Sequence, residues 1–371
     1  MKIVIVGAGI AGLSIGWRLA QSGVEVTVIE RAQPGGGATL ASAGMIAATA
    51  ENGDETSAEA KFGRASAALW PAFAAEIEEA SGRKIGLRSE GALLVAQTAQ
   101  EMAQLAARAK SIASAKTLSP AEARALEPLL NDNILGALFD PNETQVDNRA
   151  IGRALATAFV RAGGSLQTNE TVVRIEVAKV GVIAAISPFR HYHADAYILA
   201  AGAWTARING LPPEILPPVV PMKGEMISLE PRGPLPGRMV WGNEVYLVPR
   251  NNRLFVGATL SDSGFDTSLT DEAEAWLRER AIGLMPALAD WQVDEHWAGL
   301  RPGSPDDLPI IGATALEGLF VASGQFRNGI LYAPAMAEAL RSLILERRSG
   351  IDIAAFDPRR FTDPSIAKQD A

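Results

Sequence analysis

Three glycines near the start of the chain have the spacing of a phosphate-binding turn. Gly7-Ala8-Gly9-Ile10-Ala11-Gly12 follows the pattern G-x-G-x-x-G. In such a turn the first glycine permits a tight bend, the second lets backbone approach a pyrophosphate, and the third lets a helix pack closely on a strand. Glu30, eighteen residues beyond Gly12, is placed to accept hydrogen bonds from an adenosine ribose. The pattern therefore predicts a bound dinucleotide.

The elements that must position this motif follow in the expected order. Residues 2–6 form an apolar, β-branched run typical of a buried parallel strand, and residues 10–22 have the pattern of a helix. Residues 25–29 form a second strand that ends at Glu30. The helix start offers unpaired N–H groups and a partial positive charge to a phosphate. The alternatives are an ordinary βαβ unit and a secretion signal, but the start has one basic residue, three internal glycines and no cleavage site.

Composition narrows the class of protein. The 371 residues are enough for two domains, and the net charge of −8 argues against a nucleic-acid partner. The sequence contains no cysteine, which excludes disulfides, thiolate metal sites and a cysteinyl link to a cofactor. It has three histidines, so we expect no metal. The uncharged start is too short to span a bilayer, and we expect a cytoplasmic protein that binds no membrane.

The remainder of the chain alternates between two patterns. Residues 34–45 are a run of small residues, either a backbone path beside a large flat ligand or a flexible surface loop. We expect helices at 57–80, 97–113, from Ser119, 148–162, 271–283 and 330–347, and strands at 89–95, 196–204, 225–229, 245–248, 254–258, 293–299 and 318–324, with a three-stranded meander near 166, 172–178 and 182–187.

This order predicts an α/β (α+β) fold. It is a Rossmann-like cofactor-binding domain with an inserted antiparallel-sheet substrate domain. The cofactor domain is discontinuous, and the substrate pocket is expected where the two domains meet. The boundaries that we expect are 1–85, 146–215 and 300–371 for the cofactor domain, and 86–145 and 216–299 for the substrate domain.

Four segments carry a family resemblance. They are residues 6–14, 221–225, 245–250 with 256–259, and 298–303 with 324–335. In these segments the chain resembles the D-amino acid oxidase-like family of FAD-dependent oxidoreductases, and within it the bacterial glycine oxidases of thiamin biosynthesis. The match runs in order over nearly the whole chain. The N-terminal motif is shared by many flavoproteins, whereas the segment around Tyr246 and the C-terminal segments are more specific.

The resemblance implies non-covalent FAD in an extended pose. The pyrophosphate would lie at the glycine turn, the ribose on Glu30, and the isoalloxazine near Ser42–Met45 and the helix that starts at Ile330. The positions that it implies for the cofactor are Gly7, Gly9, Ile10, Ala11, Gly12, Glu30, Arg31, Thr39, Ser42, Ala43, Gly44, Met45, Val173, Ala201, Gly202, Trp204, Arg301, Gly324, Arg327, Asn328, Gly329 and Ile330.

The resemblance also implies a substrate site. Arg301 would bind the substrate carboxylate, and Tyr246 would donate its hydroxyl to the same group. Arg327 and Leu260 complete the implied site, with Arg301, Tyr246 and Arg327 as the catalytic residues in the sense of positioning. Two positions depart from the family: Leu260 stands where a well-known member has a pocket methionine, a change that would alter side-chain tolerance, and Gln325 stands where histidine can occur near the flavin, a change that would alter flavin electronics.

The implied reaction is oxidative deamination of glycine, sarcosine or a small D-amino acid. A hydride passes from the α-carbon to flavin N5, and water hydrolyses the imino acid to an oxo acid and ammonia or an amine. Molecular oxygen then reoxidises the flavin and gives hydrogen peroxide. Such chemistry needs orientation more than an acid or a base, which agrees with the scarcity of histidine.

Three other functions stay open. The first is a dehydrogenase of D-amino acids or of N-substituted or cyclic amino acids that uses an acceptor other than oxygen. The second is a non-catalytic flavin-binding protein, which would not need the carboxylate pair Tyr246 and Arg301. The third, an NAD-dependent dehydrogenase, is disfavoured by the loop at 35–45. The resemblance also suggests a homotetramer, so the expected partners are a small amino acid, oxygen and further copies of the chain.

Overall fold

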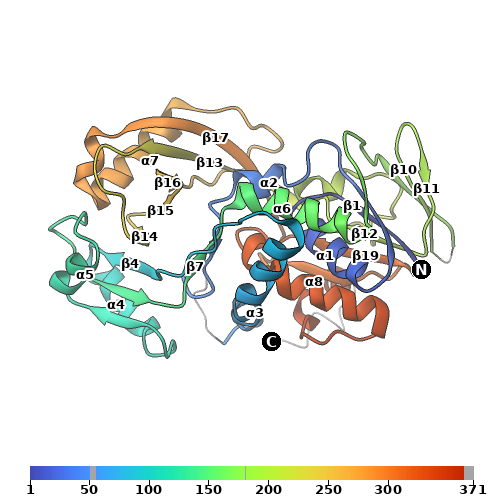
Figure 1. Cartoon of the computed structure of the whole chain (residues 1–371), viewed down its shortest axis with the longest axis horizontal. Coiled ribbons are helices and arrows are strands. Elements are labelled where there is room, and N and C mark those ends of the chain that lie inside the picture. The colour runs from blue at the N-terminus through green and yellow to red at the C-terminus, as the bar shows by residue number, and fades with distance from the viewer. Residues whose placement is uncertain (51–55, 180, 363–371) are drawn as a thin grey trace.

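The computed structural model describes residues 1–50, 56–179 and 181–362 and arranges them in two lobes (Figure 1). One lobe is built on a six-stranded sheet and the other on an eight-stranded sheet. The lobe on the right of Figure 1 carries the N-terminal β1 and α1, and the lobe on the left carries the long strands β13 and β17. No helix within the described ranges has both the length and the apolar character needed to cross a membrane.

The six-stranded sheet has the order β18-β19-β12-β1-β2-β8. Its strands are β1 (Lys2–Val6), β2 (Glu25–Ile29), β8 (Ser165–Gln167), β12 (Ala196–Leu199), β18 (Ile310–Ala313) and β19 (Leu319–Ser323). Neighbours are parallel except β18, which is antiparallel to β19. The carboxyl ends of β1, β2 and β12 therefore meet at one edge, where open α/β sheets bind ligands.

Both faces of this sheet are buried, as its continuous apolar strands predict. Ile3 and Ile5 of β1 pack in a core with four helices, whereas Val4 and Val6 pack on the opposite face against a small antiparallel sheet. The helices are α1 (Ile10–Gln21), α3 (Ala58–Ser81), α6 (Asn148–Arg161) and α8 (Gly329–Glu346), and the small sheet is β9 (Arg174–Val177), β10 (Val182–Ile186) and β11 (His191–Tyr192).

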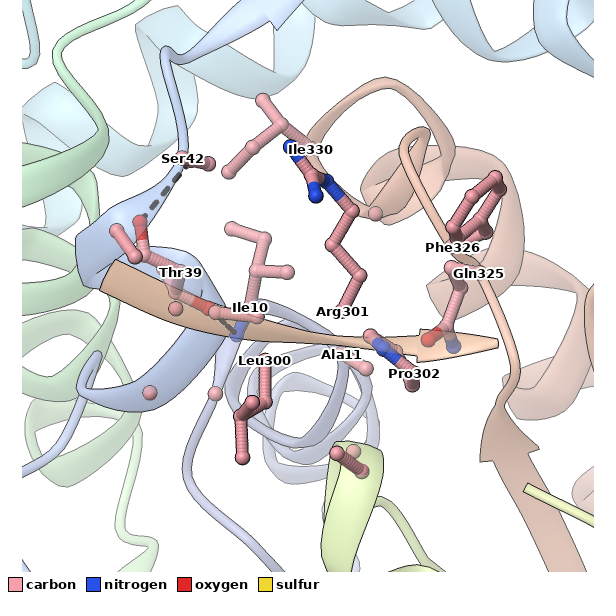
Figure 2. A pocket seen from close by; sticks show the side chains of 18 of the residues that line it. Ile10, Ala11, Thr39, Ser42, Leu300, Arg301, Pro302, Gln325, Phe326 and Ile330 are labelled. Carbon is pink, nitrogen blue, oxygen red and sulfur yellow. Dashed lines mark hydrogen bonds between the residues drawn. The ribbon is translucent and has the colours of Figure 1, made fainter. Parts of the chain in front are cut away.

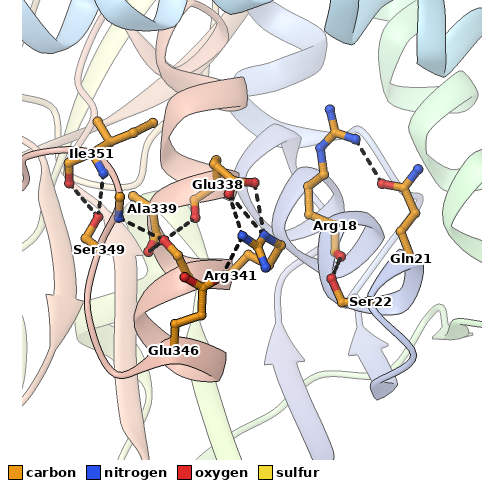
Figure 3. Close-up of polar contacts among 11 residues, drawn as sticks. Arg18, Gln21, Ser22, Glu338, Ala339, Arg341, Glu346, Ser349 and Ile351 are labelled. Atoms are coloured by element: carbon orange, nitrogen blue, oxygen red, sulfur yellow. Dashed lines mark hydrogen bonds and ion pairs between the residues drawn. The ribbon is translucent and has the colours of Figure 1, made fainter.

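Local signals fix the ends of the helices. The Ser57 hydroxyl accepts a hydrogen bond from the Ala60 amide at the start of α3, and Gly82 ends that helix with a left-handed backbone. On α8, Arg341 forms ion pairs with Glu338 and Glu346, as Figure 3 shows. These pairs lie in the C-terminal half of a helix whose first turn faces the cavity described below.

The second sheet has the order β17-β13-β16-β15-β14-β4-β6-β5 and is antiparallel except between β14 and β4. Its strands are β4 (Ala92–Ala96), β5 (Lys116–Leu118), β6 (Gly136–Asp140), β13 (Val220–Glu230), β14 (Met239–Gly242), β15 (Val245–Arg250), β16 (Arg253–Gly257) and β17 (Gln292–Gly303). One face packs against α5 (Pro120–Leu126) and α7 (Asp271–Leu284). The remaining elements are α2 (Gly37–Ala41), α4 (Ala99–Arg108), β3 (Met45–Ile46), β7 (Thr144–Gln145) and the 3₁₀ helices η1 (Gly202–Arg207), η2 (Pro286–Asp290), η3 (Ala354–Phe356) and η4 (Pro358–Phe361).

Most predicted elements are confirmed, but several details were wrong. The strand near residue 166, β8, pairs with β2 in the large sheet and not with the meander. The small-residue segment contains the short helix α2, and the helix expected to reach residue 113 ends at Arg108. The strand expected over 196–204 ends at Leu199, and its last three residues belong to the 3₁₀ helix η1. Strand β17 continues to Gly303, so Arg301 lies on a strand and not in the following turn. The strands that were not predicted are β3, β5, β6, β7, β11, β14 and β18.

Candidate active site

A cavity of about 680 Å³ lies where the two lobes meet. Its size is within the range of roughly 300–1,000 Å³ that is usual for ligand sites. The carboxyl ends of β1, β2 and β12, the segment around α2, strand β17 and the start of α8 all contribute to its wall. Every residue that the sequence assigned to the site lines it except Gly12, Gly324 and Leu260. Leu260, expected to shape the substrate pocket, is 46% exposed at the surface.

The glycine turn presents backbone to the cavity because side chains do not fit there. A Cβ on Gly7 would lie 2.4 Å from the Ala200 carbonyl oxygen, and Gly7 also has a φ of +109°. A Cβ on Gly12 would lie 1.9 Å from the Gly7 carbonyl oxygen. Gly12 therefore serves the packing of α1 and not the cavity wall. The turn is a backbone cradle at the N-terminus of a helix, which suits an anion.

Glu30 and Thr39 hold this cradle in place. The Glu30 carboxylate accepts hydrogen bonds from the Ala8 amide at 2.8 Å and from the Ala32 amide at 3.0 Å. The Thr39 hydroxyl on α2 accepts from the Ile10 amide at 2.9 Å (Figure 2). The strand end, the turn and α2 are thus tied together by side-chain oxygens of two residues that line the cavity.

Aromatic stacking closes the wall next to Glu30. The guanidinium of Arg31 lies 3.5 Å from the centre of the Trp204 ring. Trp204 in turn contacts Phe265, with 5.6 Å between ring centroids, and Arg207 lies 4.2 Å from the Phe265 ring. Phe265 belongs to the segment that joins β16 to α7, so this stack connects the two lobes beside Arg31, Trp204 and Arg207, which line the cavity.

A buried arginine that the sequence analysis gave no role supports the Ser42–Met45 segment. Arg250, only 3% exposed, donates to the carbonyl oxygens of Ala43 and Val146 at 2.7 Å each and to the Asn148 side chain at 2.8 Å. Burial lowers the pKa of Arg250 to about 10, so the guanidinium stays charged at neutral pH. Gly44 is required beside it, because a Cβ there would lie 2.0 Å from the Val146 oxygen.

Arg301 enters the cavity from β17 (Figure 2). Its guanidinium Nη1 donates to the carbonyl oxygens of Thr259 at 3.1 Å and Lys223 at 3.4 Å. It also lies against the backbone of Gly224, where a Cβ would come within 2.1 Å of Nη1 and 2.5 Å of Cζ. The cation is therefore held in one orientation by backbone oxygens and by the absence of a neighbouring side chain.

Tyr246 lines the same cavity from β15. Its ring covers Gly257, where a Cβ would lie 2.4 Å from the hydroxyl oxygen, and that hydroxyl is 3.5 Å from the Met226 sulfur. Trp241, with its ring centroid 6.3 Å from that of Tyr246, and Met45 pack in the same apolar cluster. Tyr246 thus brings a polar hydroxyl to an otherwise apolar wall.

The N-terminus of α8 forms a further part of the wall. Asn328, Gly329 and Ile330 line the cavity, and the first turn of a helix carries partial positive charge. The Asn328 amide donates at 3.1 Å to Glu59, which also accepts from the Tyr332 hydroxyl at 2.7 Å. Arg327 is exposed, and its guanidinium lies 5.3 Å from the Phe326 ring. Among the described residues, no group of three or more metal-ligating side chains is assembled.

The profile of the family described as FAD dependent oxidoreductase (DAO) matches residues 2–343. The chain belongs to this family. FAD is the cofactor of the family, and the predicted resemblance and the predicted cofactor are confirmed. The cavity fits this cofactor in the chemistry of its wall, with a backbone anion cradle, an acid at the end of β2 and a positive helix end.

Individual relatives agree with this assignment. The chain is 32% identical to a glycine oxidase of Geobacillus kaustophilus over 366 residues, which is 96% of each chain. It is 34% identical to the bifunctional protein ThiO/ThiG of a Synechocystis strain over 380 residues, and it spans only 55% of that relative's length. The crystal structure of glycine oxidase from Geobacillus kaustophilus matches with a TM-score of 0.92 at 32% identity, covering 97% of this chain and 99% of that one. The predicted fold class is confirmed by that match.

Proposed function

We propose that the chain is an FAD-dependent oxidase of small amino acids, with glycine, sarcosine and small D-amino acids as substrates. The observation that carries the proposal is that Arg301 and Tyr246 line the same cavity as the glycine turn and Glu30. A cation and a hydroxyl suit a carboxylate, and the turn and the acid suit a dinucleotide. The similarity to glycine oxidases supports the choice of substrate.

We propose that FAD and the substrate bind at different ends of the cavity. FAD would be held by the glycine turn, Glu30, the Ser42–Met45 segment and the start of α8, and it supplies the acceptor for a hydride from the substrate α-carbon. At the other end, Arg301 binds the substrate carboxylate and Tyr246 donates to one of its oxygens. The dipole of α8 stabilises negative charge on the ring that it faces.

The chain's own residues would act by orientation. The carbonyl oxygens of Thr259 and Lys223 hold Arg301, so the carboxylate is bound in one pose. Met226, Trp241 and Met45 form an apolar wall that excludes water from the bound amine. Among the described residues that line the cavity there is no histidine, which suits a reaction without an enzyme-bound proton acceptor. The products would be an oxo acid, ammonia or an amine and, with oxygen as acceptor, hydrogen peroxide.

The two lobes support the proposed domains: 1–85, 146–215 and 300–371 for the cofactor, and 86–145 and 216–299 for the substrate. Strand β17 adjusts one boundary, because it stays in the eight-stranded sheet as far as Gly303. Residues 51–55 and 363–371 lie outside the described ranges.

The proposal is tested with oxygen uptake and peroxide release on glycine, sarcosine, D-alanine and D-proline. We expect turnover of at least one of them, and Arg301→Ala should abolish it while FAD stays bound. Turnover with an artificial electron acceptor but not with oxygen would contradict the oxidase and indicate a dehydrogenase. Arg301→Ala with full activity would refute the proposed carboxylate site.

A further inference from the structure

Two charged side chains on β13 have no part in the reaction proposed above. Lys223 and Glu225 are each only 4% exposed. Because side chains alternate along a strand, they project to the face opposite Gly224 and Met226, which line the cavity. The pair therefore lies directly behind the wall that carries the substrate end of the cavity.

The pair forms a buried ion contact. The Lys223 ammonium nitrogen lies 3.0 Å from a Glu225 carboxylate oxygen. Burial disfavours the charged form of Glu225, but hydrogen bonds from Thr270 and Lys223 outweigh it and leave the pKa of Glu225 below its usual value. Buried ion pairs often contribute nothing to stability compared with apolar side chains of the same size. The role of this pair is therefore inferred from the other contacts that Lys223 and Glu225 make.

Apart from His296 on β17, those contacts reach one segment, residues 259–270 between β16 and α7, here called the strap. The Lys223 ammonium donates to the Ser268 carbonyl oxygen. The Glu225 carboxylate accepts from the Thr270 amide at 3.0 Å and from the Thr270 hydroxyl at 3.2 Å. His296 lies 3.0 Å from the same carboxylate. The ion pair thus ties the C-terminal end of the strap to β13.

The N-terminal end of the strap holds Arg301. The Thr259 carbonyl oxygen accepts from the Arg301 guanidinium at 3.1 Å. Thr259 is fixed in turn by Glu225, whose amide donates to the Thr259 hydroxyl at 2.8 Å and whose carbonyl oxygen accepts from the Thr259 amide at 3.1 Å. Ser261 and Lys223 exchange backbone hydrogen bonds at 2.9 and 3.0 Å. One continuous set of contacts therefore joins the buried pair, the strap and the guanidinium.

We propose that Lys223 and Glu225 are positioning residues for substrate binding. By fixing the strap they fix the Thr259 carbonyl oxygen, which orients the Arg301 guanidinium toward the substrate carboxylate. Neither side chain touches the substrate. The inference rests on the proposed function, because it assigns a purpose to the geometry of Arg301. It predicts that the pair sets the affinity for carboxylate while contributing little to the hydride step.

The test uses the FAD-loaded protein with Lys223→Met and with the double change Lys223→Met, Glu225→Met. The dissociation constant of acetate, a carboxylate that cannot be oxidised, is read from the flavin spectrum, and KM and kcat are measured with glycine. We expect KM and the acetate constant to rise together about tenfold, because poorer alignment of a charged hydrogen bond to the carboxylate weakens binding by about that factor. The value of kcat should stay within about twofold.

The double variant separates positioning from stability. An apolar pair can restore the melting temperature, so a stable double variant that still binds acetate weakly supports positioning. The control is Lys84→Met, which removes an exposed ion pair with Glu78 and should change neither constant. If the β13 variants do not fold, Thr270→Val and Thr270→Ser replace them. Valine removes the hydroxyl that Glu225 accepts from and should weaken acetate binding, whereas serine keeps that hydroxyl and should not.

Two results would overturn the inference. Unchanged acetate and glycine constants in every variant, with only the melting temperature lowered, would show that the pair is merely structural. A yellow wild-type protein whose spectrum responds to neither acetate nor glycine would refute the proposed function and the inference with it. The two failures are distinguished by the wild-type protein alone.

Discussion

The substitution Gly224→Ala tests the geometry of the carboxylate site with a single methyl group. Gly224 lies outside the left-handed region, so alanine suits its backbone. The added Cβ would, however, lie 2.1 Å from the Arg301 Nη1, and ordinary contacts begin at 3.4 Å. The guanidinium must therefore move by about 1.3 Å, the difference between these two distances. Because it is the end of a flexible side chain, the displacement should cost little folding free energy.

The effect of this displacement on kcat/KM should be large. A shift of about 1 Å in a positioning group can reduce the rate about 100-fold, which corresponds to about 2.7 kcal/mol. We expect kcat/KM for glycine to fall by about that factor, with unchanged FAD content and a melting temperature close to that of the wild type. Steady-state oxygen uptake measures kcat/KM, and the flavin absorbance per chain measures the FAD content.

A matched control is available in the loop between β13 and β14. Gly233 also has an ordinary backbone conformation, and a Cβ there would meet nothing within 4 Å. Gly233→Ala should leave kcat/KM unchanged. The reasoning is refuted if Gly224→Ala retains kcat/KM within threefold of the wild type, or if Gly233→Ala loses as much activity.

Three further changes have expected outcomes. Tyr246→Phe keeps the ring over Gly257 but removes the hydroxyl, and the KM for glycine should rise about tenfold; an unchanged KM would remove Tyr246 from the site. Gly7→Ala places a Cβ 2.4 Å from the Ala200 oxygen at a φ of +109°, so the purified protein should lack FAD, and a normal flavin absorbance would contradict this. Burial raises the pKa of Glu143 to about 8 from 4.5, so between these pH values the folded protein keeps a proton that the unfolded chain has lost. The free energy of unfolding should therefore fall by up to about 1.4 kcal/mol for each unit that the pH rises within this range. Glu143→Gln should flatten that slope in urea unfolding from pH 5 to 8, and an unchanged slope would show that Glu143 does not cause it.

The nucleotide end of the site could be predicted because its signal is local. Strand, glycine turn, helix, strand and acid follow one another within thirty residues, and each glycine answers a nearby steric demand. Gly7 faces Ala200, the end of a parallel neighbour strand, and Gly12 faces Gly7 itself. Such motifs can be interpreted without knowing the rest of the fold.

The substrate end could be predicted only through the resemblance, because its geometry depends on strand register. Arg301 pairs with Met222 across two long strands, which places its guanidinium over Gly224. Leu260 lies on the surface beyond the end of β16 at Gly257, where the chain departs from its pairing with β15 and keeps only the backbone hydrogen bonds of Thr259 and Ser261 to β13. No pattern of apolar and polar residues fixes where that departure occurs.

The buried charged residues that support the site were not predicted, because their contacts also depend on the fold. Arg250, Lys223 and Glu225 lie within segments that carried the family resemblance, yet charge alone predicts exposure, and all three are buried. Their partners come from distant parts of the chain, with Glu225 and Thr270 separated by 45 residues and Arg250 and Ala43 by 207. A charged residue inside an apolar strand pattern is the one signal that could have indicated them.

The most direct test of the central claim is the visible spectrum of the purified protein without oxygen, before and after glycine is added, and again after air is admitted. The proposed function predicts flavin absorption near ~370 and ~450 nm that glycine bleaches and air restores, because the bound cofactor takes up the hydride. A spectrum that neither glycine, sarcosine, D-alanine nor D-proline bleaches would contradict the proposed oxidation of small amino acids.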